Sequence, residues 1–483
     1  THEGSPLFNA VAKYGKESRP FYYEDAVYVT EDAASDWYAW KLVMEPRVLT
    51  DHEAVFGNEL IPFCDRMNLQ SSAGFPFVKW TTKKGKAWLY DYDAVDGIAN
   101  EEYREMYFSR EEAAKSGIRK PHLWISCLKD ERRKLKKIEQ GKTRAFMIAG
   151  ADWVQLFRKY FLSFCVNFYS NAGKFYSAVG VDPFSYDWTN IFRRLTEMSK
   201  EGFGIDYENF DGLTDPDLMY LFVKEINKWY RVLDKNWRVE DDRVRYVLIA
   251  DCVHSLFLAG CLMLWKTKGN PSGNPMTSVK NSFVNACYLR LAFMDIMRVL
   301  KRLCRERNIG APNELLSQYM SSNLSGYRKG IREITYGDDG VVSVASWLKG
   351  FYNLKSVAAV LSQHGIVGTS ENKEDELYET QPLTECTFLK CGFVPLKGRP
   401  NLYLAPIAQD TIFELTNWVR KSDDDVAQMR VNLHDAMKFA FHWGKEFFWK
   451  LGSDINTVLH SKGMKPIVVS YDQHREDFLE KCI

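Results

Sequence analysis

The sequence has 483 residues, of which 46% are hydrophobic and 14% aromatic, so its composition excludes a disordered or collagen-like chain. It carries 64 Lys and Arg residues against 63 Asp and Glu residues, a formal net charge of +1. This balance excludes a protein that holds nucleic acid by bulk positive charge, but it is compatible with local basic channels. The length predicts about three domains of ~150 residues each.

Ten cysteines occur without a C-x-x-C pair and nine histidines without spaced partners, which argues against a structural zinc site and a disulfide framework. We therefore expect reduced core cysteines, in a protein that folds in a reducing compartment. The most apolar stretch, Tyr246 to Trp265, carries Asp251, and an aspartate at bilayer depth costs about 2.5 kcal/mol or more. The stretch predicts a buried helix and two strands that turn at Ala259-Gly260, and no membrane-spanning segment.

The predicted elements follow the spacing of apolar residues. Residues 1–120 alternate short apolar runs with Gly and Pro, a pattern typical of an irregular α/β region. Leu123–Ile125 and Phe146–Ile148 predict two strands joined by an exposed charged loop, and Phe203–Ile205 predicts a strand that ends at Asp206. Helical spacing predicts helices over 186–198, 217–235, 278–305, 354–364 and from Thr411 onward, the last region with a capping box from Ser422 to Asp425.

Two acidic groups follow apolar strands. Asp206 ends one expected strand and Asp211 comes five residues later, while Asp338-Asp339 lie at the tip of a hairpin expected over 331–344. Carboxylates crowded at neighbouring strand ends repel each other, so they are typical of sites that hold a cation. Magnesium suits such a site because it takes a few carboxylates and leaves positions for substrate phosphates. An ordinary Asp-Gly turn is the alternative for Asp338-Asp339.

Two further segments suggest contacts with a nucleotide. Gly269 to Thr277 is a loop of small residues before the long helix that carries Asn281, and such a loop allows close approach of a nucleotide or template. A plain loop with a helix cap explains the same pattern. Lys129 to Arg144 has eight basic and three acidic residues, a local charge of +5 that can attract a triphosphate or a nucleic-acid strand. A solvated charged surface is the alternative there.

In their order and spacing these groups resemble the motifs of the RNA-dependent RNA polymerases of picornaviruses and their relatives, over the whole chain. Asp206 and Asp211 match motif A, and Tyr336-Gly337-Asp338-Asp339 matches motif C. The other matches are motif F (Lys129, Arg133, Lys137, Lys142, Arg144), motif B (Ser272, Gly273, Thr277, Asn281), motif G (Ser71, Ser72, Gly74, Phe75, Pro76), motif D (Lys373) and motif E (Phe388, Leu389, Lys390). Met276 stands where enteroviruses have Gly, and this form of motif B is similar to that of insect picorna-like viruses, the dicistroviruses and iflaviruses.

The resemblance implies an α/β (α+β) right-hand polymerase in the closed fingers–thumb form, with an antiparallel palm sheet flanked by helices and a helical thumb. The implied domains are fingers over 1–165 and 250–269, palm over 166–249 and 270–394, and thumb over 395–483. The implied activity is template-directed synthesis of RNA from ribonucleoside triphosphates by two-metal phosphoryl transfer, replicating a positive-strand RNA genome.

The resemblance also implies roles for the matched residues. Asp206, Asp338 and Asp339 are expected to bind two Mg²⁺ ions, for which Mn²⁺ can substitute, and Lys373 is expected to act as general acid. Motif F, motif B and Asp211 are expected to bind the nucleotide, and motifs G and E the RNA. Expected partners are an RNA template and primer, ribonucleoside triphosphates, a small genome-linked protein primer and other viral replication proteins. The expected location is the host cell cytoplasm, at membrane-bound replication complexes.

Three other functions fit parts of the pattern. A reverse transcriptase shares the palm, but such enzymes resemble each other in placing a bulky aromatic residue near motif A. This chain has Asp211 at that position, and Asp211 together with Asn281 favours ribonucleotides. A non-catalytic RNA-binding scaffold is expected to lack Asp206 or Asp338, and both are present. A metal-dependent phosphatase accounts for the acidic strand ends but not for the basic loop.

Overall fold

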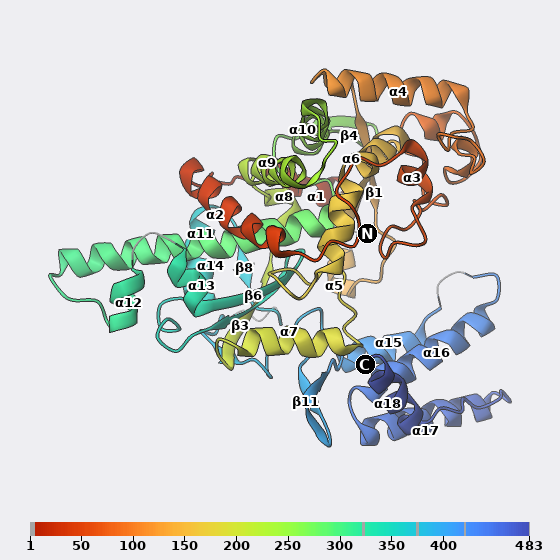
Figure 1. The fold of residues 1–483 in the computed structure, drawn as a ribbon. Coiled ribbons are helices and arrows are strands. Elements are labelled where there is room, and N and C mark those ends of the chain that lie inside the picture. The colour runs from red at the N-terminus through yellow and green to blue at the C-terminus, as the bar shows by residue number, and fades with distance from the viewer. Residues whose placement is uncertain (1–4, 321–323, 373–375, 420–421, 483) are drawn as a thin grey trace.

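The computed structural model describes residues 5–320, 324–372, 376–419 and 422–482, and it combines helices with three β-sheets (Figure 1). The N-terminal part is helical. It contains α1 (Pro6–Val11), α2 (Tyr23–Ser35), α3 (Asp51–Phe56), α4 (Glu101–Lys115) and the short 3-10 helices η1 (Ala12–Gly15), η2 (Asp36–Ala39), η3 (Phe77–Lys79) and η4 (Ala87–Leu89).

The prediction of an irregular α/β region over 1–120 was wrong. Within 5–120, the described part of that region, the only strand pairing is an isolated bridge between Tyr90 and Ile98. Apolar residues of the helices, such as Val29 and Trp37, are instead fully buried in the main hydrophobic core. Short apolar runs therefore serve here as helix faces, which the spacing alone did not separate from short strands.

A four-stranded sheet in the order β2-β1-β4-β5 carries the basic loop. Its strands are β1 (Leu123–Leu128), β2 (Ala145–Ile148), β4 (Leu256–Ala259) and β5 (Leu262–Trp265). The two strands expected around the loop are confirmed, because β1 and β2 pair antiparallel. The loop itself includes a short exposed helix, α5 (Leu135–Glu139). The helix and strand pair expected over 246–265 are also confirmed, by α10 (Val239–Val253) and by the turn at Gly260, which has a left-handed φ of 63°.

A second sheet in the order β6-β7-β3-β8, with β9 also paired to β3, holds both acidic motifs. Its strands are β3 (Glu201–Tyr207), β6 (Ile331–Tyr336), β7 (Asp339–Val344), β8 (Gly368–Thr369) and β9 (Gln381–Pro382). The strand expected to end at Asp206 and the hairpin expected over 331–344 are both confirmed, since β6 and β7 pair along their whole length.

Further helices occur between residues 151 and 363. They are α6 (Ala151–Ser170), α7 (Tyr186–Thr196), α8 (Phe210–Leu213), α9 (Pro216–Leu233), α11 (Thr277–Glu306), α12 (Glu314–Tyr319), α13 (Ser325–Gly330) and α14 (Leu354–Gln363). Four of them confirm the helices expected from apolar spacing before residue 400, within two residues at each end: α7, α9, α11 and α14. The 30-residue helix α11 begins next to the small-residue loop, contacts β6 and extends to one end of the molecule (Figure 1).

The C-terminal part has a hydrophobic cluster of its own, which includes Met437 and Phe448. It contains β10 (Val394–Leu396), β11 (Arg399–Leu404), α15 (Gln409–Asn417), α16 (Asp425–Phe441), α17 (Lys445–Ser461) and α18 (Tyr471–Glu480). The capping box expected from Ser422 was wrong: the N-cap of α16 is Asp424, whose carboxylate accepts from the Ala427 N–H. The run of three aspartates offers several caps, and the Ser422 hydroxyl donates to Asp425 instead.

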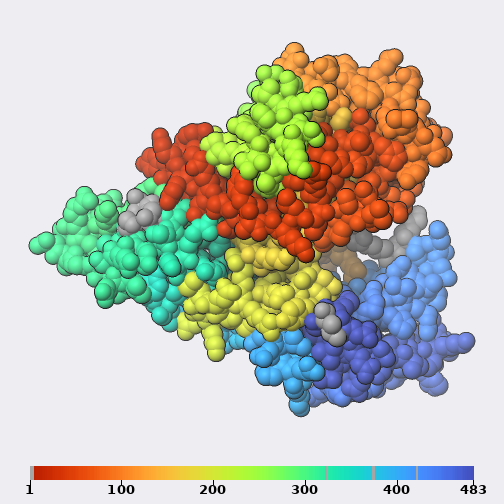
Figure 2. Space-filling view, in the orientation of Figure 1, coloured from red at the N-terminus to blue at the C-terminus, as the bar shows by residue number. Residues whose placement is uncertain are grey.

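The surface is hollowed between the N-terminal part and the C-terminal helices (Figure 2). The two sides are joined where the guanidinium of Arg132, in the basic loop, lies 4.9 Å from the ring centre of Trp418 and donates to the Glu414 carbonyl at 3.5 Å. Such a contact is expected of a closed form. The limits given above for the three domains stay predictions. Among the described residues, no helix has the length and apolar character needed to cross a membrane.

Candidate active site

Acidic residues from two strands meet at one end of the second sheet. β3 and β7 pair antiparallel up to Ile205 and Gly340, so Asp206 follows the last pair on β3 and Asp339, the first residue of β7, precedes it. Asp206 is 6% exposed, and its Oδ1 accepts from the Tyr207 N–H at 2.8 Å. Burial raises the pKa of the Tyr207 hydroxyl, and the negative charges of Asp206 and Asp338 raise it further. The structure therefore brings the end of β3, with Asp206, next to the turn that carries Asp338 and Asp339.

Helix α11 holds the acidic turn through Asn285. The Asn285 Nδ2 donates to the carbonyls of Gly337 and Asp338 at 3.2 and 3.1 Å, and its Oδ1 accepts from the Tyr207 hydroxyl at 2.9 Å. Asn285 was not predicted from the sequence. A signal was available, because Asn285 follows Asn281 by four residues and therefore lies on the same face of the helix.

Asp211 and Asn281 also meet, as expected. Asp211 lies on α8, and the Asn281 Nδ2 donates to its Oδ1 at 2.8 Å. Asn281 is 5% exposed, so it is not a solvent-facing helix residue. The resemblance also implies that Thr277 helps to orient Asp211. This expectation was wrong, because the Thr277 hydroxyl donates to the carbonyls of Ser272 and Asn274 at 3.2 and 2.9 Å. At the first turn of α11, the carbonyls of the preceding loop are the nearest acceptors.

The loop before α11 packs closely on β2. A Cβ atom at Gly273 would lie 1.6 Å from the carbonyl oxygen of Met147, so only glycine fits there. The hydroxyl of the neighbouring Ser272 is buried and has no hydrogen-bond partner among the described residues. A buried hydroxyl in this position is a donor that a bound ligand can satisfy.

The basic loop lies within electrostatic reach of the acidic turn. Glu131 organises it, since Arg133 pairs with Glu131 at 3.0 Å and the Arg144 Nε donates to the same carboxylate at 2.8 Å. The hydrogen bond to Glu131 raises the pKa of Arg144, and the charge of Asp338 raises it further. The other residues predicted to bind the nucleotide from this loop are exposed to solvent: Lys129, Lys137 and Lys142.

A further cation, Lys13, lies among these groups and was not predicted. It belongs to η1, which contacts α8. Burial lowers the pKa of the Lys13 ammonium, the charges of Asp211 and Asp338 raise it, and those of Lys129 and Arg144 lower it. Motifs A, C and F therefore all act on this one side chain. No local pattern marks Lys13, because its position depends on how the N-terminal segment packs on α8.

A cavity of about 430 Å³ lies between the loop before α11 and the residues predicted to guide the template. Lys86, one of its lining residues, is 5% exposed, and burial lowers its pKa to about 8. The polar and basic lining residues are Asn68, Ser71, Ser72, Arg66, Lys86 and Arg158, and no acidic residue lines the cavity. Three cations in a cavity that no acidic residue lines fit a phosphodiester backbone.

Gly74, Phe75 and Pro76 do not line this cavity. A Cβ atom at Gly74, which has a left-handed φ of 69°, would lie 2.0 Å from the carbonyl oxygen of Ala149. Gly74 therefore allows its backbone to approach Ala149, which lines the cavity, and it provides no side chain for RNA.

The motif E residues divide into a core residue and a turn. Phe388 is 1% exposed and stacks on Trp188 with ring centres 6.0 Å apart, so the expectation that its side chain contacts RNA was wrong. Leu389 and Lys390 have left-handed φ values of 54° and 62° and form the turn that follows it. Lys373, the expected general acid, lies outside the described residues.

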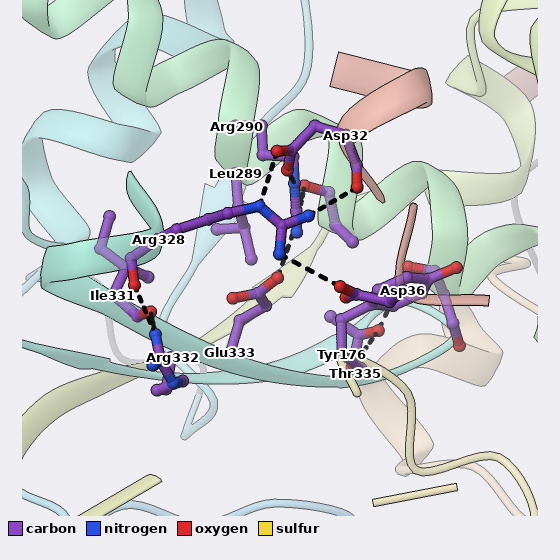
Figure 3. Close-up of polar contacts among 12 residues, drawn as sticks. Asp32, Asp36, Tyr176, Leu289, Arg290, Arg328, Ile331, Arg332, Glu333 and Thr335 are labelled. Atoms are coloured by element: carbon purple, nitrogen blue, oxygen red, sulfur yellow. Dashed lines mark hydrogen bonds and ion pairs between the residues drawn. The ribbon is translucent and has the colours of Figure 1, made fainter. Parts of the chain in front are cut away.

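A cluster of ion pairs joins α2 and α11 to β6, the edge strand of the second sheet (Figure 3). Arg290 of α11 is 2% exposed and pairs with Asp32 of α2 and Glu333 of β6, both at 2.8 Å. Arg328 pairs with Asp32 at 2.7 Å and with Asp36 at 3.1 Å. Since α11 carries motif B and β6 leads into motif C, the cluster holds both motifs against α2.

Proteins of known family resemble this chain over most of its length. Residues 4–458 match the profile of the viral RNA-dependent RNA polymerase family. A genome polyprotein of Rice tungro spherical virus (strain Vt6) is 30% identical over 486 residues, which covers 98% of this chain and 13% of that polyprotein. A replicase polyprotein of Acute bee paralysis virus (strain Rothamsted) is 29% identical over 401 residues, which covers 82% of this chain and 20% of that polyprotein. The chain therefore spans a small part of the length of these relatives.

The fold resembles that of a solved structure, the Sicinivirus 3Dpol RNA dependent RNA polymerase, with a TM-score of 0.76 and 22% sequence identity. The likeness covers 99% of this chain and 90% of that chain, and it confirms the expected right-hand fold of α+β class. The resemblance to picorna-like virus polymerases is confirmed by these relatives together with the family profile. The chain thus belongs to the viral RNA-dependent RNA polymerase family.

Proposed function

We propose that this chain synthesises RNA on an RNA template from ribonucleoside triphosphates, by in-line phosphoryl transfer, in the replication of a positive-strand RNA genome. The observation that supports the proposal most directly is the meeting of Asp206 with the Asp338-Asp339 turn, within electrostatic reach of the basic loop. Acidic strand ends that face a cationic loop suit a reaction between a polyanionic nucleotide and metal-bound oxygens.

The donor chemistry of the strand ends fits magnesium. Mg²⁺ is bound through one or two carboxylates and completes its shell with water and substrate phosphates. Among the described side chains, no group of three or more His, Cys, Asp or Glu residues is arranged to hold a metal ion. Asp206, Asp338 and Asp339 would hold two Mg²⁺ ions, or Mn²⁺ in their place. When bound, the ions would stabilise the attacking and leaving oxygens as Lewis acids.

The chain's own residues would bind and orient the reactants. Arg144 offers a planar donor fork to the triphosphate, and Lys137 adds a second cation from the same loop. Lys13 would add positive charge near Asp211 and Asp338, and Asp211 with Asn281 would bind the ribose. Lys373 would protonate the leaving pyrophosphate as general acid. Further contacts are assigned to Lys129, Arg133, Lys142, Ser272 and Gly273 for the nucleotide, to Ser71, Ser72 and Lys86 for the template, and to Leu389 and Lys390 for the primer strand.

The partners proposed for the reaction are an RNA template and primer, a small genome-linked protein that primes synthesis, and other viral replication proteins. The proposed location is the host cell cytoplasm, at membrane-bound replication complexes. Both proposals rest on the family to which the chain belongs and not on a contact within the chain.

Primer extension tests the proposed activity. The purified chain is given poly(A) template, an oligo(U) primer and UTP, with Mg²⁺ or with EDTA. We expect extension only with Mg²⁺. Comparable use of dTTP would favour a reverse transcriptase, and binding of the template without extension under any metal condition would favour a non-catalytic scaffold.

A further inference from the structure

We infer that Asn270 is a positioning residue for recognition of the ribose, an inference that rests on the proposed function. Asn270 lies in the loop before α11, between Gly269 and Pro271, in a context typical of a turn. Its side chain is completely buried, with 0% exposure. In the structure it joins Asp211 and Asn281, the two residues proposed to bind the sugar.

The Asn270 side chain is fully engaged in hydrogen bonds. Its Nδ2 donates to Asp211 Oδ1 at 3.3 Å and to Asn281 Oδ1 at 3.1 Å, and its Oδ1 accepts from the Asn274 Nδ2 at 2.7 Å. Its backbone is also held, because its N–H donates to the Asp211 carbonyl at 2.6 Å and its carbonyl accepts from the Tyr14 hydroxyl at 3.1 Å. Rotation of this side chain would break three contacts at once.

These contacts determine how Asp211 faces a substrate. An ionised carboxylate can only accept hydrogen bonds, so both amides must turn their nitrogen atoms toward it. Asn270 also occupies the Asn281 oxygen, which fixes the Asn281 Nδ2 on Asp211. Both amides donate to Oδ1, and no hydrogen-bond donor of the described residues contacts Oδ2. Asp211 thus keeps one oriented oxygen available to accept from a ribose hydroxyl.

The loop that carries Asn270 is anchored on both sides. The Lys266 Nζ donates to the carbonyls of Cys252 and Gly269 at 2.6 and 2.7 Å, which ties the loop to the end of α10. A Cβ atom at Gly269 would lie 2.5 Å from the Asp211 carbonyl, so the loop sits directly against motif A. The Ser272 hydroxyl has no hydrogen-bond partner in the described part of the chain, so Asn270, rather than Ser272, provides the second donor to Asp211.

The test compares kcat/KM for ATP and dATP on one RNA primer and template. Asn270→Ala removes the donor to Asp211, and we expect kcat/KM for ATP to fall roughly 10-fold to 100-fold with little change for dATP. Asn270→Asp keeps the volume and the acceptor for Asn274 but cannot donate, so the ATP/dATP ratio should fall at least as far. Asn285→Ala is the matched control: this buried amide on α11 does not contact Asp211, so incorporation should slow for both nucleotides at an unchanged ratio.

The outcomes separate this inference from the proposed function. A wild-type ratio in Asn270→Asp would mean that the residue only fills space and supports the loop, which overturns the inference. Equal losses of ATP and dATP incorporation in both Asn270 variants, with lowered melting temperatures, would also overturn it, because a structural role affects both sugars alike. If the wild-type chain incorporates no ATP, the proposed function itself is refuted.

Discussion

Arg290→Met removes the cation that pairs with the buried Glu333 carboxylate (Figure 3). Methionine retains an unbranched apolar stem, so the substitution mainly removes the charge and the hydrogen bonds. Glu333, which is 3% exposed, loses its paired cation, whereas Asp32 keeps Arg328 as a second partner. Removing one partner of a buried ion pair costs about 3–5 kcal/mol, because the remaining charge stays buried and uncompensated. We expect the free energy of unfolding to fall by this amount.

Equilibrium unfolding in urea, followed by tryptophan fluorescence, measures the change. Arg298→Met is the matched control on the same helix: its side chain is 38% exposed and pairs with Asp25 and Asp295, and exposed pairs contribute up to about 1 kcal/mol. The double variant Arg290→Met/Glu333→Gln should recover part of the loss, because a neutral amide needs no counter-charge. Equal losses in the two single variants, or a double variant no more stable than Arg290→Met, would refute the reasoning.

Three further predictions follow from single contacts. Burial lowers the pKa of His442 from 6.5 to about 3, so on acidification the unfolded chain takes up this proton before the folded chain does. The free energy of unfolding should therefore fall as the pH drops below 6.5, by about 2 kcal/mol from this residue at pH 5. His442→Gln should lose that part of the pH dependence in urea unfolding. Gly273→Ala should lower the free energy of unfolding by about 1–3 kcal/mol, measured by thermal or urea unfolding, and impair primer extension, because its Cβ would overlap a backbone carbonyl of β2. Gly350→Ala, where the added Cβ lies in open space, should leave the stability unchanged. Arg144→Lys loses the guanidinium fork and should raise the KM for the nucleotide more than the Kd for RNA; equal changes in steady-state kinetics and RNA titration would place Arg144 in the template channel.

The residues of the acidic motifs could be predicted because their signals are local. Asp206 and Asp338-Asp339 each adjoin a short apolar strand, and the pairing of β3 with β7 brings the strand ends together. Helices α11 and α14 could be predicted because their apolar spacing persists over several turns. The Asp211 and Asn281 pair followed from the family motifs, and its hydrogen bond is present in the structure.

Contacts between distant segments could not be predicted in the same way. Tyr14 reaches the Asn270 carbonyl across 256 positions of sequence, and neither residue type marks a site by itself. Lys86 resembles other lysines of a charged loop, and only the fold buries it in a cavity. Phe388 belongs to a motif associated with RNA, yet packing against Trp188 draws its ring into the core. In each case the tertiary environment, and not the local sequence, decides what the side chain does.

The measurement that tests the proposed activity most directly is primer extension by Asp338→Asn, with binding of the same template RNA measured in parallel. Asparagine keeps the volume of the side chain but removes the charge that a bound cation requires. Asp93→Asn, in an exposed turn, is the control and should extend the primer like the wild type. We predict that Asp338→Asn binds template RNA with nearly unchanged affinity and yields no extended primer. Extension by this variant at a rate near that of the wild type would contradict the proposed active site.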